Sequence, residues 1–396
     1  MSFIVFSPTA GAATSPIEIE KRRNLHILIE VVIEYGKAET EKAILVGLAR
    51  SSQERPLVER SLEELSQLTF SAGAEVLGRR IQVRPRPDPA FYIGRGLVAE
   101  LKEWLSTLGA NCVIFDDALS PAQQRNLEEA LEAKVLDRPV LILDIFATRA
   151  RTAAARLQVE LAQLEYTLPR LTGAWLHFSR QYGGIGAKGP GETQLEIDRR
   201  QVRMKITHLK EKLNKLDIQR ATQRKRRQPL FKVALVGYTN AGKSTLFNVL
   251  TRSQVRTADM LFTTLDSTTR VMSSGYPCRV VFSDTVGFIK KLPHQLVESF
   301  KSTLEEVCRA DLLLHMVDCS EPDYAGSFEQ TRRVLTEIGA DEIPYFLIYN
   351  KIDLFPDFHA PSINGVKAFL VSAASGAGIT ALQAELIASS TPFGRH

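Results

Sequence analysis

Cysteine is scarce in this chain, which has only four among its 396 residues. Cys112, Cys278, Cys308 and Cys319 are scattered and show no spacing typical of a metal site. Isolated thiols of this kind indicate reduced side chains of a cytosolic protein. We therefore expect a cytoplasmic location.

Long apolar runs are missing as well. The longest ones, such as "LLLHMV" at 312–317, are far shorter than a membrane span. The N-terminus has no basic region followed by an apolar core, which is the pattern of a secretory signal. We expect no transmembrane segment and no signal peptide, with residues 1–25 forming a loose leader and residues 391–396 a tail.

The charge is modest overall but uneven along the chain. The net charge is +5, yet residues 199–227 carry twelve Lys and Arg against two acids, a local net of +10 (12 − 2) that leaves −5 (5 − 10) for the remainder. A basic segment on a mildly acidic body favours a polyanionic partner, and a solvated helix face is the alternative. The hydrophobic content of 44% and the charged content of 24% are ordinary for a globular protein, and the length suggests two or three domains.

Residues 26–148 alternate between strand-like and helix-like patterns, which predicts a small α/β domain. Strands are predicted at 42–48, 79–85, 111–117 and 133–138, and helices at 56–68, 97–107 and 121–132. Ser120 followed by Pro121 is a favourable helix start, because serine caps the helix and proline suits its first turn.

Apolar residues spaced by alternating steps of three and four predict two long helices in residues 149–228. The first row is Ala150, Ala154, Leu157, Leu161, Leu164 and Leu168, and the second is Leu195, Val202, Ile206, Leu209, Leu213 and Leu216. Helices of matching period most simply form an antiparallel hairpin. The glycine-rich stretch "GGIGAKGPGETQ" (183–194) lies at its tip, which is too long to be only a turn.

The third domain, residues 229–390, opens with the apolar strand "FKVALVG" (231–237). "GYTNAGKS" (237–244) then fits the phosphate-loop pattern G-x-x-x-x-G-K-[ST], and a helical pattern follows it. Backbone N–H groups of residues 239–244 can surround phosphates at a helix N-terminus. Lys243 would neutralise the β and γ oxygens, and Ser244 would ligate Mg²⁺.

Three further boxes each follow a predicted strand. In "DTVG" (284–287), Asp284 can hold Mg²⁺ through water and the N–H of Gly287 can meet a γ-phosphate. In "NKID" (350–353), Asp353 can accept two hydrogen bonds that guanine offers and adenine does not. "VSAAS" (371–375) can offer N–H groups to guanine O6. Boxes in this order predict a GTP-binding domain with a mainly parallel sheet.

Several positions near the phosphates remain open on residue type alone. A threonine of "DMLFTTLDSTTR" (259–270) should reach Mg²⁺, and Thr263, Thr264, Thr268 and Thr269 all fit. Phe288 stands where many GTPases place the glutamine that orients water, so the isolated domain should hydrolyse GTP slowly. Asn240 stands where some GTPases use asparagine to help hold K⁺, and a loop-stabilising hydrogen bond is the alternative.

With these boxes in place, the sequence resembles the HflX family of translational GTPases over nearly the whole chain from about residue 40. The resemblance rests on "LQVELAQLEYTLPRL" (157–171), "GGIGAKGPGETQLEIDRR" (183–200), "GYTNAGKSTLFN" (237–248), "LFTTLD" (261–266), "DTVGFI" (284–289) and "NKID". It implies that Thr264 is the Mg²⁺ ligand. It also implies binding to the large ribosomal subunit and separation of the subunits of stalled ribosomes, with the hairpin reaching into the catalytic centre of the large subunit.

The predicted site therefore has three parts. The predicted catalytic residues are Lys243, Thr264 and Gly287, and the predicted Mg²⁺ ligands are Ser244 and Thr264. The predicted nucleotide-binding residues are Gly237, Tyr238, Thr239, Asn240, Ala241, Gly242, Lys243, Ser244, Phe262, Thr263, Thr264, Leu265, Asp266, Asp284, Thr285, Val286, Gly287, Asn350, Lys351, Ile352, Asp353, Ser372, Ala373 and Ala374. The predicted RNA-binding residues are Arg180, Gly183, Gly184, Gly186, Lys188, Gly189, Gly191, Arg224, Lys225, Arg226 and Arg227.

The resemblance also gives a reason for the glycines at the hairpin tip. Glycine lets the backbone pass close to RNA, where side chains would collide. Trp175, Phe178 and Tyr182 interleave with basic residues there, a composition suited to irregular RNA. A structural cap, with these aromatics packed on the hairpin, is the alternative.

We expect GTP, GDP, the large ribosomal subunit and its rRNA as partners of a monomer, with Mg²⁺ as cofactor and K⁺ left open. Two other functions remain. One is a non-catalytic RNA-binding module that uses GTP only as an ordering ligand. The other is a signalling switch for protein effectors, against which the basic hairpin argues.

Overall fold

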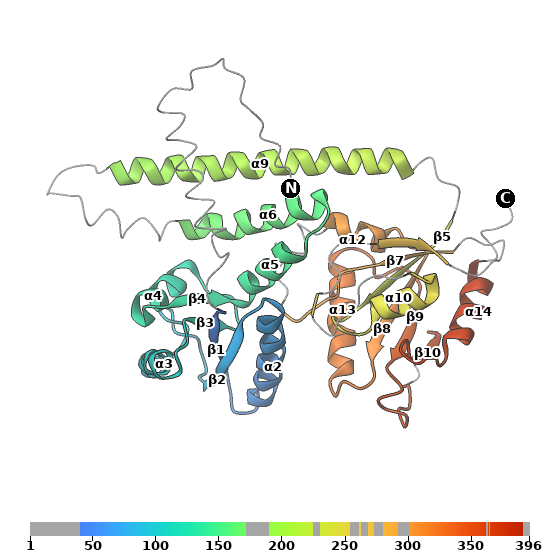
Figure 1. Cartoon of the computed structure of the whole chain (residues 1–396), viewed down its shortest axis with the longest axis horizontal. Coiled ribbons are helices and arrows are strands. Elements are labelled where there is room, and N and C mark those ends of the chain that lie inside the picture. The colour runs from blue at the N-terminus through green and yellow to red at the C-terminus, as the bar shows by residue number, and fades with distance from the viewer. Residues whose placement is uncertain are drawn as a thin grey trace, which may run out of the picture. The chain divides into compact units, whose positions relative to one another are not determined.

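The computed structural model describes residues 40–171, 190–224, 230–253, 261–262, 268–272, 280–291, 301–361, 363 and 365–390. Helices and strands alternate along these residues and form two separate sheets (Figure 1). The α/β class with parallel sheets is therefore as predicted.

The first sheet has the strand order β2-β1-β3-β4, and all its pairings are parallel. The strands are β1 (Lys42–Ala49), β2 (Glu75–Val83), β3 (Cys112–Phe115) and β4 (Lys134–Asp137). The helices that follow them in turn are α2 (Arg55–Ser71), α3 (Arg95–Leu108), α4 (Pro121–Leu131) and α5 (Arg138–Arg149). Parallel neighbours need crossover connections, which α2, α3 and α4 supply.

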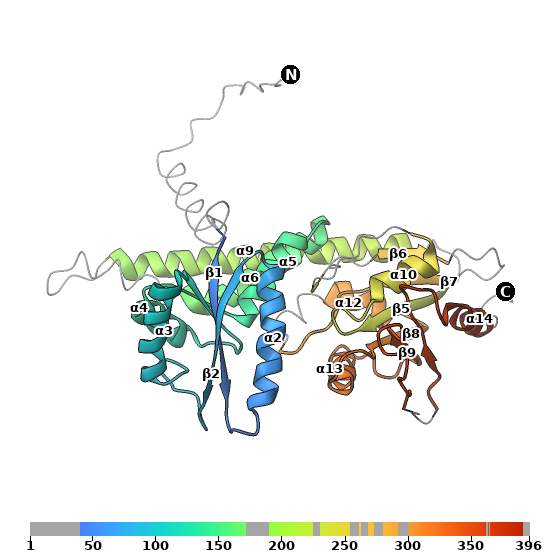
Figure 2. The same ribbon diagram turned by 60° about the horizontal axis from the view of Figure 1, so that its bottom comes forward.

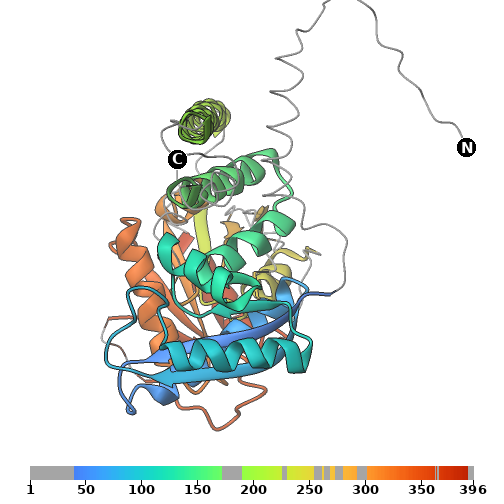
Figure 3. The same ribbon diagram turned by 90° about the vertical axis from the view of Figure 1, so that its left-hand side faces the viewer.

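Strand β1 is buried on both faces. Ala43 and Leu45 belong to the core formed with α2 and α5, whereas Ile44 and Val46 belong to the core formed with α3 and α4. In Figure 3 the teal helices of this second core lie in front of the blue strands. A strand covered on both faces reads as a continuous apolar run, which is the pattern that predicted β1.

The helical hairpin consists of α6 (Ala153–Thr167), the short helix η1 (Leu168–Arg170) and α9 (Pro190–Arg224). Helices α6 and α9 lie side by side and antiparallel in Figures 1 and 2. The packed residues are Leu157, Leu161, Leu164 and Leu168 from the first part and Val202, Ile206, Leu209 and Leu213 from the second. Two ion pairs flank this contact, Lys205–Glu160 at 2.7 Å and Lys210–Glu165 at 2.8 Å.

The second sheet has the strand order β10-β9-β8-β5-β7-β6, in which only the β6–β7 pairing is antiparallel among the described strands. Its strands are β5 (Phe231–Gly237), β6 (Thr268–Val271), β7 (Val280–Asp284), β8 (Leu312–Asp318), β9 (Tyr345–Asn350) and β10 (Ala368–Leu370). Helices α10 (Lys243–Thr251) and α14 (Ile379–Ser390) cover one face, and α12 (Lys301–Cys308) and α13 (Tyr324–Glu337) cover the other.

Four local predictions differ from the structure. Strand β2 begins at Glu75, four residues before the predicted 79–85 run. Helix α5 was not expected, and α6 begins at Ala153, so that Ala150 caps α5 instead of starting the hairpin. Helix α9 begins at Pro190, which places Gly191 in its first turn and not in the tip. The rest of the predicted tip, residues 183–189, lies outside the described residues.

Candidate nucleotide-binding site

The phosphate loop joins β5 to α10 and depends on two glycines for its shape. Gly237 has φ +152°, and a Cβ there would lie 2.4 Å from the carbonyl oxygen of Met316 in β8. Gly242 has φ +89°, and a Cβ there would lie 2.1 Å from Nδ2 of Asn350. Larger residues at either position would collide with a neighbouring strand, so the loop can lie against the ends of β8 and β9 only with glycine.

Lys243 is the first residue of α10, and its side chain folds back over the loop. Nζ donates to the carbonyl oxygens of Gly237 at 3.1 Å and Tyr238 at 2.7 Å. An ammonium group has three donors, so this arrangement leaves one for a phosphate oxygen. Burial lowers the pKa of Lys243 to about 8, although the carboxylate of Asp284 opposes the shift. An anionic phosphate placed here would restore the charged form.

Ser244 and Asp284 lie together at the ends of α10 and β7. The hydroxyl of Ser244 donates a hydrogen bond of 2.6 Å to Oδ2 of Asp284, whose side chain is fully buried. A hydroxyl and a carboxylate are hard oxygen donors of the kind that Mg²⁺ prefers, and Mg²⁺ sites beside phosphates use one or two protein oxygens. This donor pair fits Mg²⁺, as the two boxes predicted.

The "DTVG" segment (284–287) is joined to the phosphate loop by main-chain hydrogen bonds of the residue that follows it, Phe288. The N–H of Phe288 donates to the carbonyl of Gly237 at 3.1 Å, and the N–H of Thr239 donates to the carbonyl of Phe288 at 2.8 Å. The N–H of Thr239 is thus already engaged, which the expectation for residues 239–244 did not foresee. A Cβ on Gly287 would lie 2.9 Å from Nζ of Lys243, so Gly287 borders directly on this lysine, as its predicted role beside the γ-phosphate requires.

Phe288 itself points away from the phosphates. Its side chain is 2% exposed and packs with Leu304 and Val307 of α12 and Val334 of α13. A ring held in this core can neither donate to nor accept from a water molecule. The position that often carries the water-orienting glutamine therefore serves packing in this chain.

The two segments that are predicted to bind guanine, "NKID" (350–353) and "VSAAS" (371–375), are called the guanine boxes. Both are joined to the phosphate loop through Asn350, the last residue of β9. Its Nδ2 donates to the carbonyl of Ala241 at 2.9 Å, and its Oδ1 accepts from the N–H of Ala373 at 3.0 Å. Asp353 is exposed three residues later and faces the solvent side of this loop. The N–H of Ala373 is used by Asn350, which leaves Ala374 as the neighbouring donor for a guanine carbonyl.

Some predicted residues lie elsewhere or outside the described part. Thr263, Thr264, Leu265 and Asp266 are outside the described residues. The ring of Phe262 is 2% exposed and makes an edge-on contact with Phe146 of α5, with ring centroids 4.7 Å apart. Its side chain thus belongs to the first domain's core. Thr285 donates from its hydroxyl to the carbonyl of Leu235 at 2.6 Å and holds β5 to the second box.

The sequence did not predict that the first domain would contact the phosphate loop. The hydroxyl of Tyr238 donates to Oε1 of Glu64 in α2 at 2.6 Å and accepts from the N–H of Lys290 at 2.9 Å. Nζ of Lys291 pairs with Asp117 at 2.6 Å and with Asp116, both at the end of β3. Sequence periodicity cannot predict contacts between residues so far apart in the chain. The position of Tyr238 in the phosphate loop, and of Lys290 and Lys291 shortly after "DTVG", was the only feature of the sequence that placed these residues near the site.

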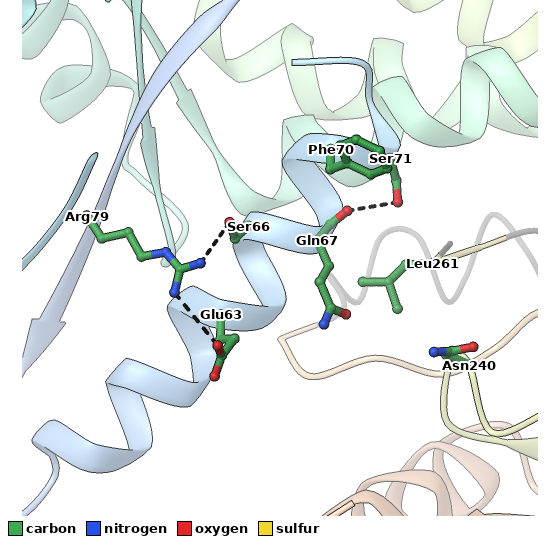
Figure 4. Close-up of a pocket in the computed structure, with 8 residues that line it drawn as sticks. All are labelled: Glu63, Ser66, Gln67, Phe70, Ser71, Arg79, Asn240 and Leu261. Carbon is green, nitrogen blue, oxygen red and sulfur yellow. Dashed lines mark hydrogen bonds and ion pairs between the residues drawn. The ribbon is translucent and has the colours of Figure 1, made fainter. Parts of the chain in front are cut away.

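A cavity of about 450 Å³ separates α2 from the phosphate loop beside this contact. Figure 4 shows Gln67 of α2 and Leu261 extending toward each other, with Asn240 on the loop nearby. Asn240 has φ +62°, a left-handed conformation that asparagine tolerates better than most residues. The loop is therefore approached by the first domain on this side.

None of the described helices is both long and apolar enough to cross a bilayer. The same part of the chain holds no cluster of three His, Cys, Asp or Glu side chains suited to a metal ion. No disulfide joins the described cysteines, Cys112, Cys308 and Cys319.

Comparison with known proteins matches three sequence families along the chain. Residues 59–147 match the family described as "GTP-binding GTPase N-terminal" and residues 149–227 the "GTP-binding GTPase Middle Region". Residues 232–351 match the family described as "50S ribosome-binding GTPase". These three matches follow the order of the first domain, the hairpin and the nucleotide-binding domain.

Whole-chain relatives agree with this order. The chain is 49% identical to GTPase HflX of Flavobacterium psychrophilum, covering 80% of this chain and 76% of that protein. It is 46% identical to GTPase HflX of Escherichia coli, covering 86% and 81%. The crystal structure of a complex of SsGBP and GDP shares the fold, with a TM-score of 0.50 and 23% identity over 90% of this chain and 100% of that one. The resemblance and the enzyme class that the motifs predicted are confirmed.

Proposed function

We propose, from the premise that the chain belongs to the HflX family of GTPases, that it binds the large ribosomal subunit and separates the subunits of stalled ribosomes. The observation that carries this proposal is the basic segment 199–227, most of which forms helix α9, in the same chain as a GTPase domain. A polyanion is the partner for which such a helix is suited. The description "50S ribosome-binding GTPase" of the family matched by residues 232–351 supports the same partner.

The cations of α9 differ in what they contact. Lys205 and Lys210 pair with carboxylates of α6, which joins α9 to α6 within the hairpin. Arg203, Lys212 and Lys215 are exposed. Exposed cations spaced along a rigid helix can follow an RNA backbone, because a helix holds their spacing while phosphates approach.

In this proposal the residues of the tip, with Arg180, Lys188 and the glycines from 183 to 189, contact rRNA, and the basic residues from Arg224 to Arg227 add affinity. The nucleotide that occupies the GTPase domain determines when the protein binds the ribosome. Ser244, Asp284 and Thr264 would hold Mg²⁺, which neutralises phosphate charge when bound. Lys243 and the N–H of Gly287 would orient the γ-phosphate.

Hydrolysis by the free protein is expected to be slow, because Phe288, at the position where many GTPases have the water-orienting glutamine, is buried in the core. The ribosome would complete the catalytic arrangement by positioning and electrostatics. Asn240 carries the remaining question of K⁺. Replacing KCl by NaCl should lower turnover if Asn240 helps to hold K⁺, and should change nothing if its side chain only stabilises the loop.

The test is a sucrose-gradient splitting assay on a variant in which residues 183–189 are replaced by a short Gly-Ser turn. We expect intact GTP binding, weak association with large subunits and loss of subunit separation. The wild-type protein without GTP is the control for nucleotide dependence. Full splitting by the variant would show that the glycines form only a structural turn, and GTP turnover unaffected by large subunits would favour the non-catalytic alternative.

A further inference from the structure

Tyr238, the second residue of the phosphate loop, makes polar contacts through both its carbonyl and its side-chain hydroxyl. Its carbonyl accepts from Nζ of Lys243, and its hydroxyl donates to Glu64 while accepting from the N–H of Lys290. The side chain is 7% exposed and packs in the core of the first domain. Burial and the neighbouring carboxylate of Glu64 raise the pKa of Tyr238, so the hydroxyl stays protonated and keeps donating.

The peptide of Lys290 is held on both sides. Its N–H reaches Tyr238, and its carbonyl accepts from NH1 of Arg138 at 2.9 Å. Arg138 is fully buried and lies 3.5 Å from Glu64 and 3.3 Å from Asp116. Glu64 thus touches both groups that hold this peptide, and it comes from helix α2 of the first domain.

Residue 290 is three positions after Gly287, and the chain between them is fixed at both ends. Gly287 borders Lys243, and Phe288 is bonded to Gly237 and Thr239 by its main chain. After Phe288, the hydroxyl of Tyr238 and the guanidinium of Arg138 hold the N–H and the carbonyl of Lys290. The hydroxyl of Tyr238 is thus one of the groups that hold the chain that follows Gly287. A reacting group displaced by about 1 Å can cost about 100-fold in rate.

We propose that Tyr238, held by Glu64, is a positioning residue for GTP hydrolysis that aligns Gly287 and Lys243 on the γ-phosphate. The first domain thereby completes the active site of the GTPase domain. This role matters more here than in enzymes with a water-orienting glutamine, because Phe288 leaves alignment as the main source of rate. GDP lacks the γ-phosphate and so makes no contact with the N–H of Gly287, and its affinity should depend on the alignment much less than the rate of hydrolysis does.

The experiment compares kcat and KM for steady-state GTP hydrolysis, and the affinity for GDP, between Tyr238→Phe and the wild type. The substitution keeps the ring in its core and removes only the hydroxyl. We expect kcat to fall at least about tenfold, with GDP affinity and KM changed less than about twofold. Glu64→Ala should reproduce this loss, and Glu64→Gln should retain most of the rate, because an amide oxygen still accepts from the phenol.

Tyr166→Phe is the matched control. Its hydroxyl also donates to a carboxylate, that of Asp137, and accepts from an arginine, Arg170, but it lies in the hairpin away from the nucleotide. Glu63→Ala, one residue from Glu64, controls for helix α2. Both should hydrolyse GTP at the wild-type rate. A wild-type kcat in Tyr238→Phe and Glu64→Ala would overturn the proposal, as would equal losses of GTP and GDP affinity that track a lower Tm.

Discussion

The side-chain amide of Asn350 donates a hydrogen bond of 2.9 Å to the carbonyl oxygen of Ala241 in the phosphate loop. Its oxygen accepts from the N–H of Ala373, and the side chain is 2% exposed. One amide therefore ties together the phosphate loop and both guanine boxes. The loops that are predicted to bind the base and the phosphates therefore share the side chain of Asn350.

Removing this amide should weaken binding of every guanine nucleotide. Asn350→Ala leaves a carbonyl and an N–H buried without partners, at a cost of about 2 kcal/mol or more in stability. We expect a lower Tm and GDP and GTP affinities reduced by similar factors. Asn126→Ala, which removes a side-chain bond to Ala90 in the first domain, should lower Tm without changing nucleotide affinity. A nucleotide affinity unchanged in Asn350→Ala would contradict the role of this side chain.

Base selection should reside in the exposed carboxylate of Asp353. Asp353→Asn loses two hydrogen bonds to guanine, and we expect GTP affinity to fall by about 100-fold. Xanthosine triphosphate should bind the variant better than the wild type, because the amide can pair with the ring carbonyl of xanthine. Asp357→Asn on the same exposed loop is the control and should keep GTP preference. Competition binding with the two nucleotides measures the switch, and unaltered GTP affinity would remove Asp353 from the site.

Short-range features of the fold were predictable from sequence because their causes are local. The phosphate loop needs glycine at 237 and 242 for its φ angles and for contact with neighbouring strands, and both stand at motif positions. The leucine rows of the hairpin repeat every few residues. Ser120 caps α4 through Gln123, as its place before Pro121 predicted. Each of these patterns is complete within a few turns or one loop.

Features that join distant segments were not predictable in the same way. Tyr238 and Glu64 are separated by 174 positions, and nothing in either local pattern requires their contact. Helix α5 was missed because "VLILDIF" suits a buried strand or helix equally. Two residues marked the start of α5 in the sequence. They are Asp137, whose side chain accepts a hydrogen bond from the N–H of Val140 and so caps the helix, and Pro139 in its first turn. Pro190 likewise marked the start of α9 within the glycine-rich stretch.

Nucleotide affinity should fall as the pH rises above about 8. In the free protein burial lowers the pKa of Lys243 to about 8, so the ammonium loses its proton above that pH, whereas bound phosphate favours the charged form. Binding must then take up one proton, and affinity should fall by up to about tenfold per pH unit. Calorimetry in buffers of different ionisation enthalpy measures this uptake. Lys243→Arg stays charged and should lose the pH dependence; a wild-type affinity that is flat from pH 7 to 9.5 would refute the shift.

Acid sensitivity should come partly from His315 in β8. The imidazole is 1% exposed, stacks on Phe328 at 4.6 Å, and neither ring nitrogen has a hydrogen-bond partner among the described residues. Burial lowers its pKa to about 3, with the cations of Arg332 and Lys243 adding to the shift. The folded state therefore stays unprotonated while the unfolded state gains a proton below pH 6.5. Stability should fall from pH 6.5 toward pH 3 by about 1.4 kcal/mol per unit from this group.

The matching variant is His315→Leu, which fills a similar space with no polar atom. Its free energy of unfolding should exceed that of the wild type, with a larger gain at pH 5 than at pH 7. Exposed His359→Leu should show no such difference. Denaturant titrations at the two pH values give the comparison. An equal effect of His315→Leu at both would mean that the imidazole is protonated, or solvated, in the folded protein.

Ribosome binding should separate the two sets of lysines and arginines on α9. Arg203, Lys212 and Lys215 are exposed, and neutralising all three with glutamine should weaken association with large subunits. If each meets an RNA phosphate, the slope of log affinity against log salt should become shallower by about 2 to 3, since fewer counterions are released.

The control variant changes Lys205 and Lys210, which are already paired with Glu160 and Glu165 of α6. Glutamine at these two positions should change the slope by less than about 1 and lower the Tm of the hairpin only slightly, because exposed pairs contribute little. Equal slope changes in the two variants would mean that the basic helix acts by its total charge and not through these three exposed cations in particular.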